Sequence, residues 1–435
     1  MSVKRLFINA TVVTMKDGAE VLKQGALGVE DDKITYVGEV PEPQVQEQFD
    51  EIIDCSGKAI LPGLVNTHGH AAMTLLRGYA DDLPLQTWLE EHMWPLEAKF
   101  THVQVQAGTA LAAVEMIRSG TTCFMDMYDH MDAVARVVEE SGMRARLTRG
   151  VIGLCSEEMQ NKKFEEAVRF ATEWHGQADG RITTMLAPHA PYTCPPEYIK
   201  RFVEKAGELK LPLHTHMSET AKEVEQNVRD YGVRPVEHLR GLGFFDLPAL
   251  VAHAVHVTEE EIDILAQHDV KVAHNPGSNL KLGSGIAPVT SMLRKGMRPG
   301  LATDGAASNN NLDLIEEIQL AALIHKGAHL DPEAVPALTA LKMGTSYGAE
   351  CLFLDHEIGT LEVGKKADFI TLDLTGAHMQ PLHDVVSHIV YSASRGDVVD
   401  MYVNGQPLMV NRELLTLDEE KIRHEATRAF QALLQ

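Results

Sequence analysis

The two ends of the chain differ from its middle in the order of hydrophobic and polar residues. Short runs rich in β-branched side chains and bounded by turn residues, typical of antiparallel strands, occur at residues 5–15, 33–38, 51–60, 367–374 and 400–410. Within the last run, Asn404-Gly405 predicts a two-residue hairpin turn. Neither end is long enough to enclose a generous core, so we expect the two ends to pair into one small, discontinuous β-sandwich.

In the middle of the chain, apolar strand-like runs alternate with longer stretches of helical periodicity. This alternation is typical of βα units that build a parallel sheet. The strand candidates are residues 59–65, 121–127, 144–151, 182–187, 211–215, 250–255, 270–274 and 297–303. Eight is the number of strands that closes a (β/α)8 TIM barrel. The predicted fold class is therefore α/β, a TIM barrel with the small sandwich attached.

The length of the chain agrees with this division. A barrel needs roughly 250 residues, which leaves enough of the 435 for a second, smaller domain. We expect residues 61–356 to form the barrel, residues 1–60 and 357–415 to form the two parts of the sandwich, and residues 416–435 to form a C-terminal helix.

Charge and composition narrow the possible functions. The formal net charge of −23 disfavours binding to nucleic acid or to an anionic membrane, because phosphates would be repelled. No signal-peptide pattern and no run of about eighteen apolar residues occurs. The five cysteines are scattered and lack CxxC spacing, which disfavours a disulfide framework and a thiolate zinc site. We expect a protein of the reducing cytoplasm.

Candidate chemistry gathers at the carboxyl ends of the predicted barrel strands. His68 and His70 lie two residues apart after the first strand, so both rings can reach one metal ion. Further candidates at the later strands are His189, His216, His253, His274 and Asp304. A single histidine at such a place is more often an ordinary core residue, but barrel active sites lie at this end of the strands. The joint pattern predicts a hydrolytic metal site.

Five motifs together resemble the amidohydrolase superfamily and, more narrowly, its 5-methylthioadenosine/S-adenosylhomocysteine deaminases. The motifs are PGLVNTHGH (62–70), HTHMSE (214–219), AHA (252–254), HNPGSNLKLG (274–283) and TDGAASNN (303–310). The resemblance extends over nearly the whole chain.

The resemblance implies a single divalent metal, usually zinc with iron as the alternative, bound by His68, His70, His216 and Asp304. Binuclear relatives need a lysine near the fourth strand, and residues 186–192 contain none. A bound zinc ion lowers the pKa of its water toward about 7, and the resulting hydroxide would attack C6 of adenine.

Three residues are expected to move or orient protons in that reaction. Glu219 would donate a proton to N1 of the purine, since the developing charge must be neutralised. Asp304 would take a proton from the water and pass it toward the leaving amine. His253 would orient the hydroxide, whereas an odd strand offset turns His256 to the opposite face. His274 is expected to support the site rather than to act in it.

Substrate recognition rests on the same resemblance. Glu97 would accept hydrogen bonds from the ribose 2′- and 3′-hydroxyls. Glu219 and Asp304 would contact the purine, and His189 would form a hydrogen bond near its N3. Arg149 would meet the ribose or the 5′-tail, or else form a structural ion pair. Apolar residues of the segment 71–100 would cover a thioether tail or simply pack on the barrel.

The sequence departs from the family pattern after the third strand. Relatives that bind the charged homocysteine tail can carry a second arginine there, but residues 155–163 offer only Lys162 and Lys163. Lysine cannot grip a carboxylate in a bidentate manner. The uncharged methylthioadenosine is therefore expected to be the main substrate.

Two other functions stay open on the sequence alone. One is guanine or s-triazine deamination or dechlorination on the same scaffold, which needs no acceptor for a ribose diol. The other is a non-catalytic assembly protein, which has no need to keep the metal ligands. The expected partner is a small nucleoside, with self-association into a homo-oligomer left open.

Overall fold

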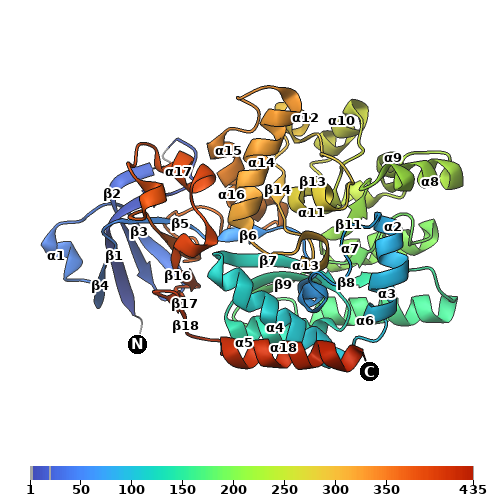
Figure 1. Ribbon diagram of the computed structural model, residues 1–435, viewed down its shortest axis with the longest axis horizontal. Coiled ribbons are helices and arrows are strands. Elements are labelled where there is room, and N and C mark those ends of the chain that lie inside the picture. The colour runs from blue at the N-terminus through green and yellow to red at the C-terminus, as the bar shows by residue number, and fades with distance from the viewer. Residues whose placement is uncertain (1–2, 19–20, 435) are drawn as a thin grey trace.

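The computed structural model describes residues 3–18 and 21–434. Residues 1–2 and 19–20 of the predicted sandwich, and residue 435 of the predicted C-terminal helix, lie outside the described residues. Strands from both ends of the chain share one sheet, as predicted (Figure 1). The sheet runs in the order β18-β17-β16-β15-β5-β1-β2-β3, with β4 beside β1. Its strands are β1 (Lys4–Val13), β2 (Val21–Glu30), β3 (Lys33–Glu39), β4 (Glu51–Asp54), β5 (Lys58–Pro62), β15 (Phe369–Asp373), β16 (Val398–Val403), β17 (Gln406–Val410) and β18 (Glu413–Leu414).

Local sequence explains how this sheet bends and encloses a core. Asn404 and Gly405 both have positive φ (48° and 69°), as the predicted hairpin between β16 and β17 requires. Strand β1 pairs with β4 before Asn9 (φ 62°) and with β5 after it. Phe7 and Phe369 meet edge to face with ring centroids 5.0 Å apart, so side chains from both ends of the chain fill one core.

One predicted strand is wrong in its extent, because residues 59–65 do not form a single barrel strand. The chain bends after Pro62: β5 stays in the terminal sheet, whereas β6 (Leu64–Asn66) is the first barrel strand. Gly63 lies between them, and a Cβ there would stand 2.0 Å from Thr122 Oγ1. Only glycine allows this close approach of the bend to the next strand.

The barrel consists of parallel strands in two hydrogen-bonded groups. The strands are β6, β7 (Thr121–Tyr128), β8 (Arg144–Val151), β9 (Ile182–Thr184), β10 (Ala187–Pro188), β11 (Leu213–Met217), β12 (Ala249–His253), β13 (Lys271–His274) and β14 (Gly300–Leu301). Backbone hydrogen bonds join the groups on both sides, from His214 N to Leu186 O (3.0 Å) and from Thr67 N to Leu301 O (3.0 Å). The strands are thereby linked in a ring around small apolar side chains such as Ala252, Ala273 and Ala302.

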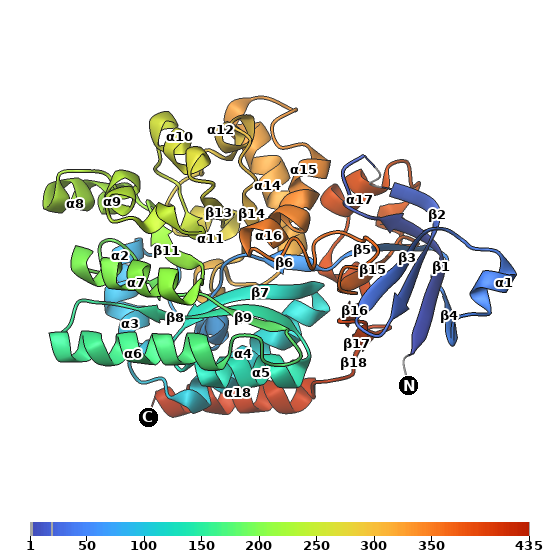
Figure 2. The ribbon, with the colours of Figure 1, turned by 180° about the vertical axis from the view of Figure 1, so that it is seen from behind.

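Helices cover the outside of this ring (Figure 2). The main helices of the chain are α4 (His102–Arg118), α5 (Met131–Ser141), α6 (Glu157–Glu173), α7 (Pro196–Leu209), α8 (Ala221–Tyr231), α9 (Pro235–Gly241), α10 (Glu259–Gln267), α12 (Val289–Arg294), α14 (Leu314–His329), α15 (Ala337–Met343), α16 (Ser346–Cys351), α17 (Val385–Tyr391) and the C-terminal α18 (Glu419–Leu433). Of these, α17 packs on α14 and α15, and α18 packs on α4. Shorter helical elements are α1 (Pro43–Gln46), η1 (Ala71–Leu76), α2 (Leu85–Thr87), η2 (Trp88–Met93), α3 (Trp94–Glu97), η3 (Phe244–Asp246), α11 (Pro276–Lys281), α13 (Ala306–Asn309), η4 (Ala377–Met379) and η5 (Arg395–Asp397). Among the described residues, no helix has both the length and the apolar character needed to cross a bilayer.

A buried ion pair joins the barrel to the terminal sheet. Arg144 is the first residue of β8, and its guanidinium donates to both carboxylate oxygens of Asp368, at 2.7 and 3.2 Å. Both side chains are only 1% exposed. Asp368 Oδ1 also accepts from the backbone N–H of Asn404, in the turn between β16 and β17. The bidentate geometry therefore fixes the sheet against the amino end of a barrel strand.

We predict that Asp368→Asn lowers the free energy of unfolding by about 3–5 kcal/mol, because the substitution removes the bidentate carboxylate partner of a buried guanidinium and leaves the more distant, partly exposed Glu357 (3.4 Å) as its countercharge. Urea denaturation of the metal-loaded protein measures this. The matched control is Asp269→Asn, since Asp269 pairs with Lys271 at 2.6 Å but is 84% exposed. That loss should stay below about 1 kcal/mol. Equal losses in the two variants would contradict the role given to the buried pair.

Candidate metal centre and active site

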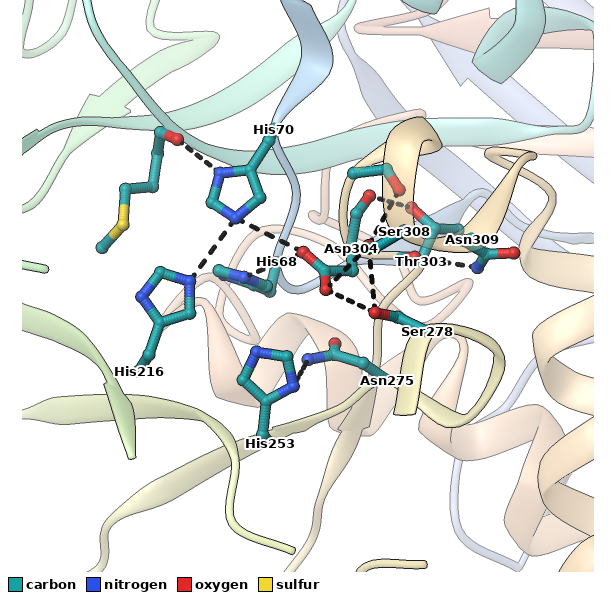
Figure 3. A network of polar contacts seen from close by, with 12 residues as sticks. His68, His70, His216, His253, Asn275, Ser278, Thr303, Asp304, Ser308 and Asn309 are labelled. Atoms are coloured by element: carbon teal, nitrogen blue, oxygen red, sulfur yellow. Dashed lines mark hydrogen bonds and ion pairs between the residues drawn. The ribbon is translucent and has the colours of Figure 1, made fainter. Parts of the chain in front are cut away.

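Four predicted ligands converge at the carboxyl end of the barrel (Figure 3). His68 and His70 follow β6, His216 lies within β11 and Asp304 follows β14. The Nε2 atoms of His68 and His70 lie 3.4 and 3.3 Å from Asp304 Oδ1. The Nε2 atoms of His70 and His216 lie 3.4 Å apart. The donor atoms within the sets His68/His70/His216 and His68/His253/Asp304 lie within 4.8 Å of one another.

The backbone fixes which nitrogen of two of these rings carries the proton. His70 Nδ1 lies 2.7 Å from Met127 O, and His216 Nδ1 lies 2.7 Å from His189 O. A carbonyl oxygen only accepts, so each Nδ1 donates. Both Nε2 atoms are then unprotonated and present their lone pairs to the centre. Burial also holds the pKa of His216 well below its usual value, which keeps this ring neutral.

The proton position of His68 is set through a second histidine. His214 Nδ1 faces Leu250 O at 3.0 Å and donates to it, so His214 Nε2 accepts from His68 Nδ1 at 3.0 Å. His68 Nε2 is therefore unprotonated as well. This atom is buried and has no hydrogen-bond partner within the described part of the chain. Burial lowers the pKa of His68 to about 4, and a neutral, buried nitrogen of this kind fits a metal ion.

Asp304 turns one carboxylate oxygen to the histidines and the other to two serines. Oδ2 accepts from Ser278 Oγ at 2.7 Å and from Ser308 Oγ at 3.2 Å. Burial would raise the pKa of Asp304, but its contacts with His68 and His70 bring that pKa well below its usual value. The serines thus leave Oδ1 as the oxygen that faces the ligand set.

His253 and Glu219 face each other on the other side of this centre. His253, the last residue of β12, has Nδ1 2.9 Å from Asn279 Oδ1 and Nε2 3.7 Å from Glu219 Oε2. Burial raises the pKa of Glu219, while the positive charge of His253 opposes that rise. A carboxyl with a raised pKa keeps its proton longer and suits a general acid.

The ligand set opens into a cavity of about 410 Å³, a size within the range of small-molecule sites. All the predicted catalytic and substrate-binding residues line it: Glu97, Arg149, His189, Glu219, His253 and Asp304. The predicted apolar segment contributes Met73, Leu85, Trp88, Leu89, Trp94 and Phe100. The segment therefore lines the cavity and also contributes to the main core, in which several of these side chains pack.

The three predicted recognition residues have definite partners. Tyr128 donates its hydroxyl to Glu97 Oε1 at 2.5 Å. His189 Nδ1 lies 2.9 Å from Thr193 Oγ1. Arg149 pairs with Asp129 at 2.9 Å and with Glu166 at 3.6 Å, so the ion-pair alternative describes its contacts even though it lines the cavity.

Two other histidines considered from the sequence do not line the cavity. His256 Nε2 lies 2.8 Å from Ser284 O. His274 is buried against His325, with their Nε2 atoms 3.2 Å apart. Both positions agree with the expectation that neither acts directly in the reaction.

Several residues that contact the candidate site residues were not predicted from the sequence. His214 forms a second HxH pattern with His216, so spacing alone was a usable signal. Tyr128 ends a barrel strand, as other site residues do. Ser278 and Ser308 lie in the motifs 274–283 and 303–310, but no spacing rule shows that both donate to the Asp304 carboxylate.

The chain is similar to known proteins over most of its length. The model of the amidohydrolase family matches residues 59–408. A 5-methylthioadenosine/S-adenosylhomocysteine deaminase from Halalkalibacterium halodurans is 52% identical over 431 residues, which cover 98% of each chain.

Solved structures agree with the sequence comparison. An adenosine deaminase from Xanthomonas campestris with bound zinc superposes with a TM-score of 0.94 at 37% identity, covering 99% of both chains. An atrazine chlorohydrolase from Arthrobacter aurescens complexed with zinc gives a TM-score of 0.90 at 26% identity, covering 98% of this chain and 100% of the other. Since the family model runs from β5 through the whole barrel into β17, this chain belongs to the amidohydrolase family.

Proposed function

We propose that this protein is a zinc-dependent aminohydrolase that deaminates adenosine-type nucleosides at C6 and releases ammonia. Its substrates are 5′-methylthioadenosine, which gives 5′-methylthioinosine, and S-adenosylhomocysteine, which gives S-inosylhomocysteine, with adenosine as a third candidate. The observation that carries the proposal is a His/His/His/Asp donor set that borders one cavity, which the Glu219 and Glu97 carboxyls also line. The 52% identity to a deaminase with this activity in its name supports it.

His68, His70, His216 and Asp304 would hold one zinc ion. Three neutral imidazole nitrogens and one carboxylate oxygen form a donor set that zinc accepts, and iron is the alternative. Zinc, when bound, supplies the Lewis acidity that lowers the pKa of a water molecule to about 7.

The protein's own residues supply the remaining chemistry. Asp304 accepts a proton from the attacking water and passes it toward the leaving amine. Glu219 delivers a proton to N1 of the purine, and its buried setting favours the protonated form before the attack. His253, facing Glu219, orients the water and stabilises the tetrahedral intermediate that forms when the water adds to C6.

Other residues of the cavity bind the ribose and the remainder of the purine. Glu97 accepts from the ribose hydroxyls and His189 binds the purine near N3. The charge of Arg149 is already balanced by Asp129 and Glu166. A guanidinium engaged in this way gains less from a substrate carboxylate, which favours the uncharged methylthio tail.

Guanine or s-triazine chemistry is not favoured by these observations. The atrazine chlorohydrolase shares the fold at 26% identity, about half the value for the methylthioadenosine-type deaminase. The Glu97 carboxylate, which we propose accepts from a ribose diol, would have no such role with a substrate that lacks a ribose. A cytoplasmic location, suggested by five free cysteines, and self-association remain predictions from the sequence.

The first test is substrate turnover with and without metal. We expect purified protein to release ammonia from methylthioadenosine with a higher kcat/KM than from S-adenosylhomocysteine, adenosine or guanine. Removal of the metal by a chelator should abolish this activity, and added Zn²⁺ should restore it. Leading turnover of guanine, or full activity of the metal-free protein, would overturn the proposed function.

A second prediction concerns the general acid. Glu219→Gln keeps the size of the side chain but removes the transferable proton, so kcat should fall by about 10²–10⁴-fold with the bound zinc content unchanged. Glu225→Gln, an exposed position on α8, is the matched control and should keep full activity. A kcat within a few-fold of wild type in Glu219→Gln would exclude this residue as the acid.

A third prediction separates nucleosides from free bases. Glu97→Ala removes charged hydrogen bonds to the ribose, which contribute about 1.5–3 kcal/mol each, so kcat/KM for nucleosides should fall at least about tenfold, mainly through KM. Turnover of any free base should be unaffected. Unchanged nucleoside kinetics would instead favour the guanine or triazine alternative.

A further inference from the structure

Tyr128 links a barrel strand to the segment that carries Glu97. It is the last residue of β7, whereas Glu97 ends α3 in the helical stretch outside the barrel. The hydroxyl donates to Glu97 Oε1 at 2.5 Å, and both side chains line the cavity. Burial and the negative charge of Glu97 hold the pKa of Tyr128 well above its usual value, so the hydroxyl stays a donor.

The Tyr128 ring is itself held by neighbours of the metal centre. Its centroid lies 6.4 Å from the ring of His70 and 6.3 Å from that of Phe100. The preceding residue, Met127, accepts the Nδ1 proton of His70 through its carbonyl oxygen. The hydroxyl therefore occupies a position fixed relative to the ligand set.

Within residues 3–18 and 21–434, the Glu97 carboxylate has no hydrogen-bond partner other than the Tyr128 hydroxyl. The terminal torsion of a glutamate side chain is broad, so without an anchor the plane of the carboxylate is poorly defined. A carboxylate has about four lone-pair sites, and the tyrosine hydroxyl occupies one of them. The others remain for donors in the cavity, and two adjacent ribose hydroxyls are donors of that kind.

We propose that Tyr128 is a positioning residue for Glu97, which orients the carboxylate toward the ribose diol and thereby sets the preference for nucleosides with both hydroxyls. This inference rests on the proposed nucleoside function. It gives Tyr128 a role in substrate specificity through its contact with the Glu97 carboxylate, although Tyr128 takes no part in the proton transfers.

Tyr128→Phe tests the inference, because it removes the hydroxyl and keeps the ring between His70 and Phe100. The best nucleoside substrate is compared with its 2′-deoxy and 3′-deoxy analogues. For the intact ribose, kcat/KM should fall about tenfold through KM, with kcat within about twofold of wild type. The preference over the deoxy analogues should shrink by a similar factor. The matched control is Tyr198→Phe. The Tyr198 hydroxyl is buried and donates to Gln160 O (2.8 Å), and Tyr198 does not line the cavity, so this variant should change neither quantity.

A double variant and a binding measurement complete the test. In a Glu97→Ala background, Tyr128→Phe should cause no further loss, since the group that it positions is gone. The Kd of the inosine-type product, measured by calorimetry, should rise in Tyr128→Phe by the same factor as KM. Equal losses for intact and deoxy substrates, a loss confined to kcat, or additive losses in the double variant would overturn the inference.

Failure of the inference and failure of the proposed function have different signatures. Wild-type protein that deaminates nucleosides, with Tyr128→Phe unchanged in KM and Kd, would refute the positioning role alone. Wild-type protein that neither binds nor deaminates nucleosides would refute both.

Discussion

The metal centre depends on the position of three protons. His68, His70 and His216 can act as ligands through Nε2 only because each keeps its proton on Nδ1, and in each case a backbone carbonyl enforces that choice. The acceptors are Met127 O, His189 O and, through His214, Leu250 O. These carbonyls belong to other barrel strands or their ends. A shift of one residue in the register of β7, β10 or β12 would turn an acceptor away, so the ligand chemistry is a consequence of how these strands pair.

In strand β8, the residue that forms a stabilising ion pair and the residue that lines the cavity lie at opposite ends of the strand. Its first residue, Arg144, is buried against Asp368 and fixes the terminal sheet. Its Arg149, five residues later, lines the cavity. The amino end of the strand can therefore hold a rigid ion pair without disturbing the end that receives substrate. This division agrees with the placement of active sites at the carboxyl face of such barrels.

Sequence patterns predicted the barrel and the His68/His70 pair because both depend on local properties of the chain: the alternation of strand-like and helix-like runs, and two histidines at one strand end. For His216 and Asp304, these patterns gave only the strand-end positions, and the family resemblance supplied the ligand role. They failed where tertiary packing decides: residues 59–65 divide at Gly63 because Thr122 leaves no room for a side chain, and residues 182–187 divide into β9 and β10. The partners of Asp304 were also out of reach, since Ser278 and Ser308 are brought to one oxygen by two separate helical turns.

The groups proposed to react and the groups proposed to recognise the nucleoside lie on different parts of the structure. The proposed ligands and proton carriers lie at or beside strand ends, where the ring of strands fixes them. Glu97 lies on a segment outside that ring, so its position relative to the metal depends on contacts such as the Tyr128 hydroxyl. Two related structures superpose almost equally well, with TM-scores of 0.94 and 0.90, although their names give different reactions. The fold therefore cannot distinguish substrates in this family, and the distinction must lie in the few contacts that place groups like Glu97 over a common metal centre.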